Sequence, residues 1–170
     1  EALGILEGVG RNLDNPQLLM RPLQNREALT SSSLEGTYVT PEELLLYEID
    51  PQEPNPHDEQ KLDWQEVHNY SGALARGCEM IDAENLPFIL RVIKEMHRTL
   101  LQGARGQRAR AGEFRPWQVQ LGSEGRFIPP PHLEVPDLMG NLEQYMNTRD
   151  ERINPLVQCF VVHYQFEAIH

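Results

Sequence analysis

Apolar residues recur every three or four positions along most of the chain, which is the spacing of one face of an α-helix. Short-range signals mark where the predicted helices begin and end. The spacing predicts helices over about residues 3–13, 22–34, 41–47, 64–81, 87–103, 135–145 and 154–170. The sequence therefore predicts a mainly α-helical fold.

Helix boundaries are signalled most clearly in the first fifty residues. Asn15 and Pro16 form a cap followed by a first-turn proline, and Pro22 is expected to break or kink the chain before a helix restarts. Gly36 suits the left-handed residue that ends that helix. Thr40, followed three residues later by Glu43, predicts a capping box at the start of the next one.

The last predicted helix is apolar on nearly all sides, as in the run Cys-Phe-Val-Val at residues 159–162. A helix with no polar face is usually buried, so we expect it at the centre of the fold. Cys78 and Cys159 lie in apolar helical patterns, which favours small buried hydrophobic residues over a disulfide framework.

Residues 102–132 depart from the helical pattern, being rich in Gly, Arg and Pro. Within them, residues 117–121 alternate apolar and polar side chains, as a half-exposed strand does. Residues 122–125 supply a turn, and residues 126–128 can return as the partner strand before Pro129 ends the pairing. This segment predicts one β-hairpin on the helical protein.

Composition adds few constraints. The 170 residues suffice for one domain with a small appendage, and the net charge is −11. A surface this acidic repels phosphate backbones, so nucleic acid is a poor candidate for the main partner. No apolar run is long enough to span a membrane, and no signal peptide is visible. The expected location is the cytoplasm.

Three features could carry chemistry, and each has a simpler interpretation. His163, Glu167 and His170 share one helix face and could bind a metal, although an ion pair or a solvated helix end is the better interpretation of that pattern alone. Glu35 stands at a helix carboxyl end, where a carboxylate is unfavourable unless a cation meets it. Arginines are concentrated in and around the hairpin segment, where they form a solvated loop or a phosphate-binding rim. They are Arg98, Arg105, Arg108, Arg110, Arg115 and Arg126.

Four segments together resemble the Fic family. Residues 31–36, Ser-Ser-Ser-Leu-Glu-Gly, are similar to its inhibitory-helix pattern. Residues 67–70, Val-His-Asn-Tyr, resemble the start of an early core helix. Glu-Phe-Arg at 113–115, with Phe-Ile-Pro-Pro-Pro at 127–131, resembles the flap hairpin. Residues 163–170 resemble the helix that leads into the catalytic motif His-Pro-Phe-x-x-Gly-Asn-Gly-Arg, of which His170 would be the first residue.

The resemblance implies a protein adenylyltransferase that moves AMP from ATP, with Mg²⁺, to a Ser, Thr or Tyr hydroxyl of a target protein. His170 would be the general base. Ser31, Glu35 and Gly36 would belong to the inhibitory element, whose glutamate pairs with the motif arginine. The resemblance places part of the flap beside target and nucleotide: Glu124, Gly125, Arg126 and Phe127.

The resemblance also implies an organisation. Residues 1–60 would form a helical region that holds the inhibitory helix, at about 22–36, and an acidic, proline-rich loop. Residues 61–170 would form the first part of a Fic-like helical core, with the flap at about 113–130. We expect the chain as given to be inactive, with no tightly bound metal or cofactor, and possible self-association. The alternatives are AMP removal using Glu35 and a non-catalytic interaction module.

Overall fold

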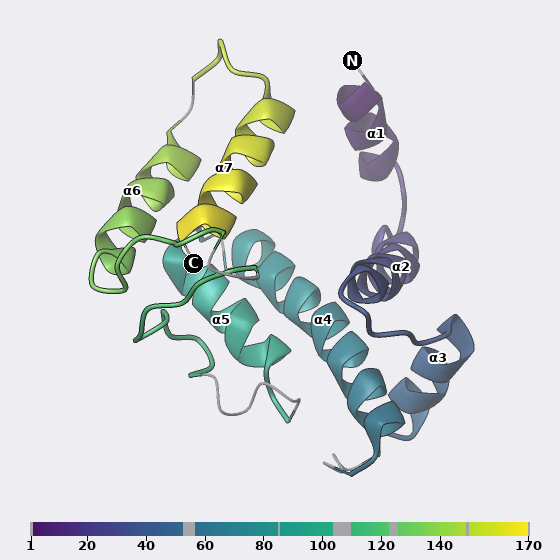
Figure 1. The fold of residues 1–170 in the computed structure, drawn as a ribbon. Helices are drawn as coiled ribbons and strands as arrows, with labels where there is room; N and C mark the ends of the chain where they lie inside the picture. The colour runs from purple at the N-terminus through teal and green to yellow at the C-terminus, as the bar shows by residue number, and fades with distance from the viewer. Residues whose placement is uncertain are drawn as a thin grey trace.

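The fold of this computed structural model is mainly helical, as the apolar spacing predicts (Figure 1). The structure describes residues 2–52, 57–84, 86–103, 110–122, 126–148 and 150–169. The helices among these residues are α1 (Ala2–Arg11), α2 (Gln17–Leu34), α3 (Pro41–Ile49), α4 (Glu59–Asp82), α5 (Leu90–Leu100), α6 (Val135–Asn147) and α7 (Pro155–Ile169).

An antiparallel pair of helices, α4 and α5, forms the centre of the molecule (Figure 1). The pair is close because α4 presents glycines to α5: a Cβ at Gly77 would lie 2.6 Å from the Met96 sulfur, and one at Gly72 would lie 3.7 Å from Thr99. Helices α2 and α3 pack on α4 on one side of this pair, and α6 packs on α5 and α7 on the other.

The core is divided into two apolar clusters, one on each side of the central pair. Ala28, Leu44 and Val67 join α2, α3 and α4. The second cluster joins α6 to the last residue of α7 and contains Val135, Met139, Leu142 and Ile169. Burying a Val, Leu or Ile side chain contributes about 1.5–3 kcal/mol, so each cluster fixes the helices that it joins.

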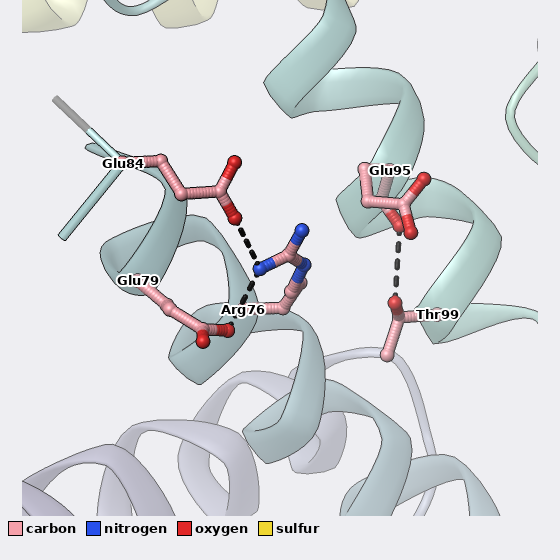
Figure 2. Close-up of polar contacts among 5 residues, drawn as sticks. All are labelled: Arg76, Glu79, Glu84, Glu95 and Thr99. Carbon is pink, nitrogen blue, oxygen red and sulfur yellow. Dashed lines mark hydrogen bonds and ion pairs between the residues drawn. The ribbon is translucent and has the colours of Figure 1, made fainter. Parts of the chain in front are cut away.

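Polar contacts close the connection between α4 and α5 (Figure 2). Arg76 Nη1 lies 2.8 Å from Glu79 of the same helix and 2.7 Å from Glu84 of the connection. On α5, Thr99 donates to the backbone carbonyl of Glu95 at 3.1 Å. Exposed ion pairs of this kind contribute little to stability, so the apolar packing holds the pair together.

Three of the predicted helix boundaries are confirmed. Thr40 Oγ1 accepts from the Glu43 N–H at 3.2 Å, and the Glu43 carboxylate accepts from the Thr40 N–H at 2.8 Å, which is the complete capping box. Gly36 has a φ of 92° and ends α2. At the start of α7, Asn154 Oδ1 accepts from the Leu156 N–H at 2.9 Å.

The expected break at Pro22 is wrong, because α2 runs without interruption from Gln17 through Pro22. A proline removes one backbone hydrogen bond and crowds the preceding turn. The rest of α2 is anchored by Ala28, which is fully buried against Leu44 and Val67. Tertiary packing therefore outweighs the local penalty.

The expectation that the last helix lies at the centre is also wrong. Among the described residues, α7 packs mainly on α6, while Leu156, Phe160 and Tyr164 remain exposed. Cys78 and Cys159 are exposed rather than buried. An apolar sequence shows that a helix can be buried, but packing partners decide which sides are covered.

The predicted β-hairpin is reduced to one pair of residues in the described chain. The Leu121 N–H donates to the Phe127 carbonyl at 2.9 Å, and the Phe127 N–H donates back at 3.2 Å. Residues 123–125 of the turn lie outside the described residues. The ladder does not extend past Ile128 because residues 129–131 are prolines, which have no N–H to donate. Part of the acidic loop, residues 53–56, is also outside them.

Candidate functional site

The carboxyl end of α2 and the turn after it, residues 31–37, carry the inhibitory-helix pattern. This segment is called the platform below. The Thr37 N–H donates to the Ser32 carbonyl at 2.9 Å and the Gly36 N–H to the Ser33 carbonyl at 3.2 Å, which together make a Schellman motif. Thr37 Oγ1 donates to Glu66 of α4 at 3.2 Å and ties the platform to the central pair. Ser31 Oγ donates to Glu27 at 2.8 Å, within the same helix.

Glu35 is exposed and directly follows Leu34, the last residue of α2. Its backbone N–H donates to Ser32, but its carboxylate has no hydrogen-bond or ion-pair partner among the described residues. A helix carboxyl end carries partial negative charge, so the position is electrostatically unfavourable for a carboxylate without a cation. The carboxylate is therefore free to accept one.

The flap is held by side chains rather than by a strand ladder. Gln118 Nε2 donates to the Pro129 carbonyl at 2.9 Å and so joins the two arms where no backbone donor exists. Within residues 118–120, the described backbone N–H groups make no backbone hydrogen bond. Arg126 and Phe127, on the return arm, are exposed, whereas Glu124 and Gly125 lie outside the described residues.

Arg115 joins the base of the flap to the end of α7. Its guanidinium donates to the carbonyls of Trp117 at 3.1 Å, of Pro130, and of Ile169 at 3.2 Å. Three carbonyls from three segments thus share one cation. Ile169 is itself buried in the α6–α7 cluster, so its peptide is fixed by its side chain and by its carbonyl.

A histidine of α5 holds the loop that leads into the flap. The Gly112 N–H donates to His97 Nδ1 at 3.0 Å, which requires that nitrogen to be unprotonated. Burial lowers the pKa of His97 below its ordinary value of 6.5. Next to it, the Lys94 ammonium lies 4.1 Å from the centre of the Phe114 ring.

The candidate metal face on α7 is not assembled in the described part of the molecule. His163 and Glu167 are exposed, and the third member, His170, lies outside the described residues. Within the described ranges, no group of three or more His, Cys, Asp or Glu side chains could hold a metal ion. The same ranges contain no helix with the length and apolar character needed to cross a bilayer.

A cavity of about 560 Å³ is lined by α4, α5, α6 and α7 and by Glu113 and Phe114 at the base of the flap. Its walls are mainly apolar, with Tyr70, Leu142 and Phe166 among them. Lys94 and His163 also line it, so a few polar groups interrupt a largely apolar surface, as in many small-molecule sites.

The Val-His-Asn-Tyr segment of α4 has a structural role. The buried Asn69 donates to the carbonyls of Leu100 at 3.0 Å and Gln102 at 2.6 Å, and accepts from Gln65 at 2.9 Å. It thereby supplies hydrogen-bond donors at the carboxyl end of α5, where the last carbonyls have no partner within the helix. This bond fixes α5, and with it His97, relative to α4.

The sequence-predicted site residues that the structure describes are not joined into one centre. Among the described residues, no hydrogen bond or ion pair links residues 31–36 to the flap or to α7. Sequence reasoning treated Arg115 as one of several loop arginines and missed its role. A signal was present, because Arg115 lies between Phe114 and the apolar pair Pro116 and Trp117, where a solvated charge is uncommon.

Two family models match the chain. The model described as Fic/DOC family N-terminal matches residues 1–79, and the model described as Fic/DOC family matches residues 87–170. Together they cover nearly the whole chain. The resembling segments at 31–36 and 67–70 lie within the first match, and those at 113–131 and 163–170 lie within the second.

Proposed function

The chain belongs to the Fic/DOC family. From this premise we propose that it is part of a protein adenylyltransferase whose activity is restrained by Glu35. The reaction moves AMP from ATP to a Ser, Thr or Tyr hydroxyl of a target protein. The hydroxyl oxygen forms a bond to the α-phosphorus, and the bond from that phosphorus to the bridging oxygen breaks, so pyrophosphate leaves. Mg²⁺ belongs to the substrate, as Mg-ATP.

His170 is the general base in this proposal. It takes the proton of the attacking hydroxyl, and an imidazole with a reference pKa of about 6.5 is mostly neutral at physiological pH, as a base must be. The preceding residue, Ile169, supports this role for His170. Ile169 is buried and its carbonyl is held by Arg115, so the chain reaches position 170 from a fixed peptide.

The flap presents the target. Residues 118–120 offer backbone groups without backbone partners among the described residues, and an extended target segment can add to such an edge as a strand. Arg126 and Phe127 belong to the return arm on the other side of the flap, and Glu124 and Gly125 lie between the two arms in sequence. These four residues are proposed to lie where the flap meets target and nucleotide.

Glu35 acts as a brake. The observation that carries this part is its exposed carboxylate, which has no described partner and stands on a platform tied to α4 through Thr37. The proposed partner is the arginine of the motif that the resemblance places after His170, which would otherwise bind ATP. Ser31 and Gly36 build the platform: Gly36 supplies the left-handed turn.

The test is substitution of Glu35 in the complete protein, with labelled ATP as the readout. A charge-assisted hydrogen bond contributes about 1.5–3 kcal/mol, and about 1.4 kcal/mol is a factor of ten. Glu35→Gln should therefore raise AMP transfer, including self-modification, roughly tenfold to a hundredfold. Glu35→Gly should do the same, although glycine also loosens the helix end. Adding His170→Ala should abolish the gain.

The matched control is Glu151→Gln, which neutralises another exposed glutamate, outside any helix. Its AMP transfer should equal that of the unchanged protein. If Glu35→Gln leaves the rate of a folded protein unchanged, Glu35 is a tolerated surface acid and the brake is disproved. If no variant transfers AMP to itself or to a candidate target, the proposed transferase activity fails.

A second candidate is a non-catalytic interaction module, favoured by the exposed apolar side chains of α7 and the flap, such as Phe160 and Ile128. It predicts partner binding that survives His170→Ala. AMP removal, in which Glu35 activates water, is the third. It predicts that Glu35→Gln abolishes release of AMP from a modified target, the opposite sign to the brake.

A further inference from the structure

The Arg115 guanidinium is a single link between the two parts of the proposed site. It donates to Pro130, on the return arm of the flap, and to Ile169, which directly precedes His170 in the chain. The bond to Trp117 at 3.1 Å fixes the outgoing arm as well. One planar cation therefore contacts both arms of the flap and the end of α7.

Among the described residues, no backbone N–H donates to any of these three carbonyls. Hydrogen bonds from a charged guanidinium are stronger than those between neutral groups, so the cation holds all three carbonyls. Across the flap, Pro129, Pro130 and Pro131 have no N–H, so no ladder can align the arms beside them. An arginine has five donors in a rigid planar fork, and this fixed geometry suits three acceptors that are themselves held in place.

The side chain is also positioned for this role by its surroundings. Arg115 is partly buried, and its Nε is buried without a hydrogen-bond partner among the described residues. Burial removes competing water and leaves the guanidinium with the three carbonyls. The neighbouring Phe114 packs on the α6–α7 cluster that also holds Ile169, so the two ends of the link share one rigid base.

We propose that Arg115 is the positioning residue that sets the place of His170 relative to the flap. This inference rests on the proposed AMP transfer and deepens it. The flap presents the hydroxyl and His170 takes its proton, so their separation determines whether the proton can be transferred. A misplacement of about 1 Å between reacting groups costs about 100-fold in rate.

The test uses the complete protein in the Glu35→Gln background. Arg115→Ala should lower kcat for AMP transfer about 100-fold while KM for ATP stays within twofold, because the proposal gives Arg115 contacts to protein carbonyls and none to the nucleotide. Millimolar guanidinium should restore activity several-fold in Arg115→Ala and not at all in His170→Ala. Arg115→Lys keeps the charge but has no fork, so it should stay close to Arg115→Ala.

Arg110→Ala is the matched control, since Arg110 is exposed in the same segment and, among the described residues, pairs with the nearby Glu113 at 3.3 Å. It should leave kcat unchanged. A folded Arg115→Ala protein with normal kcat overturns the proposal. So does a loss of rate that follows only a loss of folded protein in thermal melts and is not rescued by guanidinium.

A second readout does not depend on AMP transfer. Hydrogen exchange should become faster together in peptides covering residues 126–130 and 160–169 of Arg115→Ala, and in neither for Arg110→Ala. Exchange that changes in one segment alone, or in neither, overturns the link. Coupled changes in a protein that transfers no AMP would refute the proposed function and leave the link between flap and α7 standing.

Discussion

Single residues set the geometry of the loop below the flap. Gly112 has a φ of +80°, a conformation that costs residues with a Cβ about 1–2 kcal/mol. A Cβ there would lie 2.9 Å from the Lys94 carbonyl and 2.8 Å from an Arg98 nitrogen. The backbone of α5 cannot move aside, so this position requires glycine for both conformation and space.

Gly112→Ala should therefore lower the free energy of unfolding by about 2–4 kcal/mol, from backbone strain and overpacking together. Urea unfolding measures it. Gly140 of α6 is the control, since no described atom lies within 4 Å of where its Cβ would be. Gly140→Ala should stabilise the protein by about 0.5–1 kcal/mol. Equal effects at the two positions would contradict the argument.

His97 makes the same loop sensitive to acid. Burial lowers its folded pKa below 6.5, so in the interval below pH 6.5 the unfolded chain binds more protons than the folded one. The stabilisation is complete above pH 6.5 and is lost as the pH falls through the folded pKa. Protonation of Nδ1 also removes the acceptor of the Gly112 N–H.

Urea midpoints at about pH 7.5 and pH 5 should show this loss. Other groups titrate in the same range, so the informative quantity is the difference from His97→Asn, whose amide oxygen can accept from Gly112 but does not titrate. His97→Asn should lose less stability on acidification. An identical loss in both proteins would show that His97 does not contribute.

At the scale of elements, the described residues of the flap form one internal backbone pair and leave one open edge. Residue 121 pairs inward with Phe127, and because strand backbone groups alternate in direction, those of Gln120 point to the open edge. A change at residue 121 therefore tests the flap's own backbone pairing, and a change at residue 120 tests its proposed binding of a target strand.

Gln120→Pro should reduce modification of protein targets and leave ATP binding by the complete protein unchanged, because it removes a donor from the open edge alone. Leu121→Pro should also reduce target modification, and in addition should speed hydrogen exchange in the flap by breaking the pair with Phe127. Isothermal calorimetry checks ATP binding. Loss of ATP binding in both variants would mean that the region had unfolded.

At the scale of the whole molecule, α7 leaves a large apolar surface uncovered. Phe160 is 72% exposed and Tyr164 is 69% exposed, whereas Phe166 on another side of α7 packs against the Val135 cluster. Apolar surface of this kind promotes association. The 170-residue chain should self-associate and bind an apolar dye.

Phe160→Gln should reduce dye binding and association with almost no change in melting temperature, because the ring is already in water. Phe166→Gln should instead lower the stability by about 2 kcal/mol or more, since it removes a packed ring. Light scattering and dye fluorescence measure the first effect and thermal melts the second. A strictly monomeric chain with no dye binding would contradict the prediction.

The sequence alone determined the elements and many of their ends, because these depend on contacts between residues a few positions apart. The Thr40–Glu43 box, the left-handed Gly36 and the Asn154 cap each involve a separation of four residues or fewer, so they can be predicted from local pattern. The Fic/DOC resemblance rests on the same kind of local segment and is confirmed by the family models.

Only the tertiary structure decided what the elements do together. Arg115 reaches carbonyls 15 and 54 residues away, and Asn69 reaches carbonyls 31 and 33 residues away, so no local pattern predicts them. Periodicity established that α7 was apolar but not which sides other helices would cover. The prolines that end the flap ladder were visible in the sequence; the side chains that replace the ladder were not, because their bonds depend on where distant segments meet.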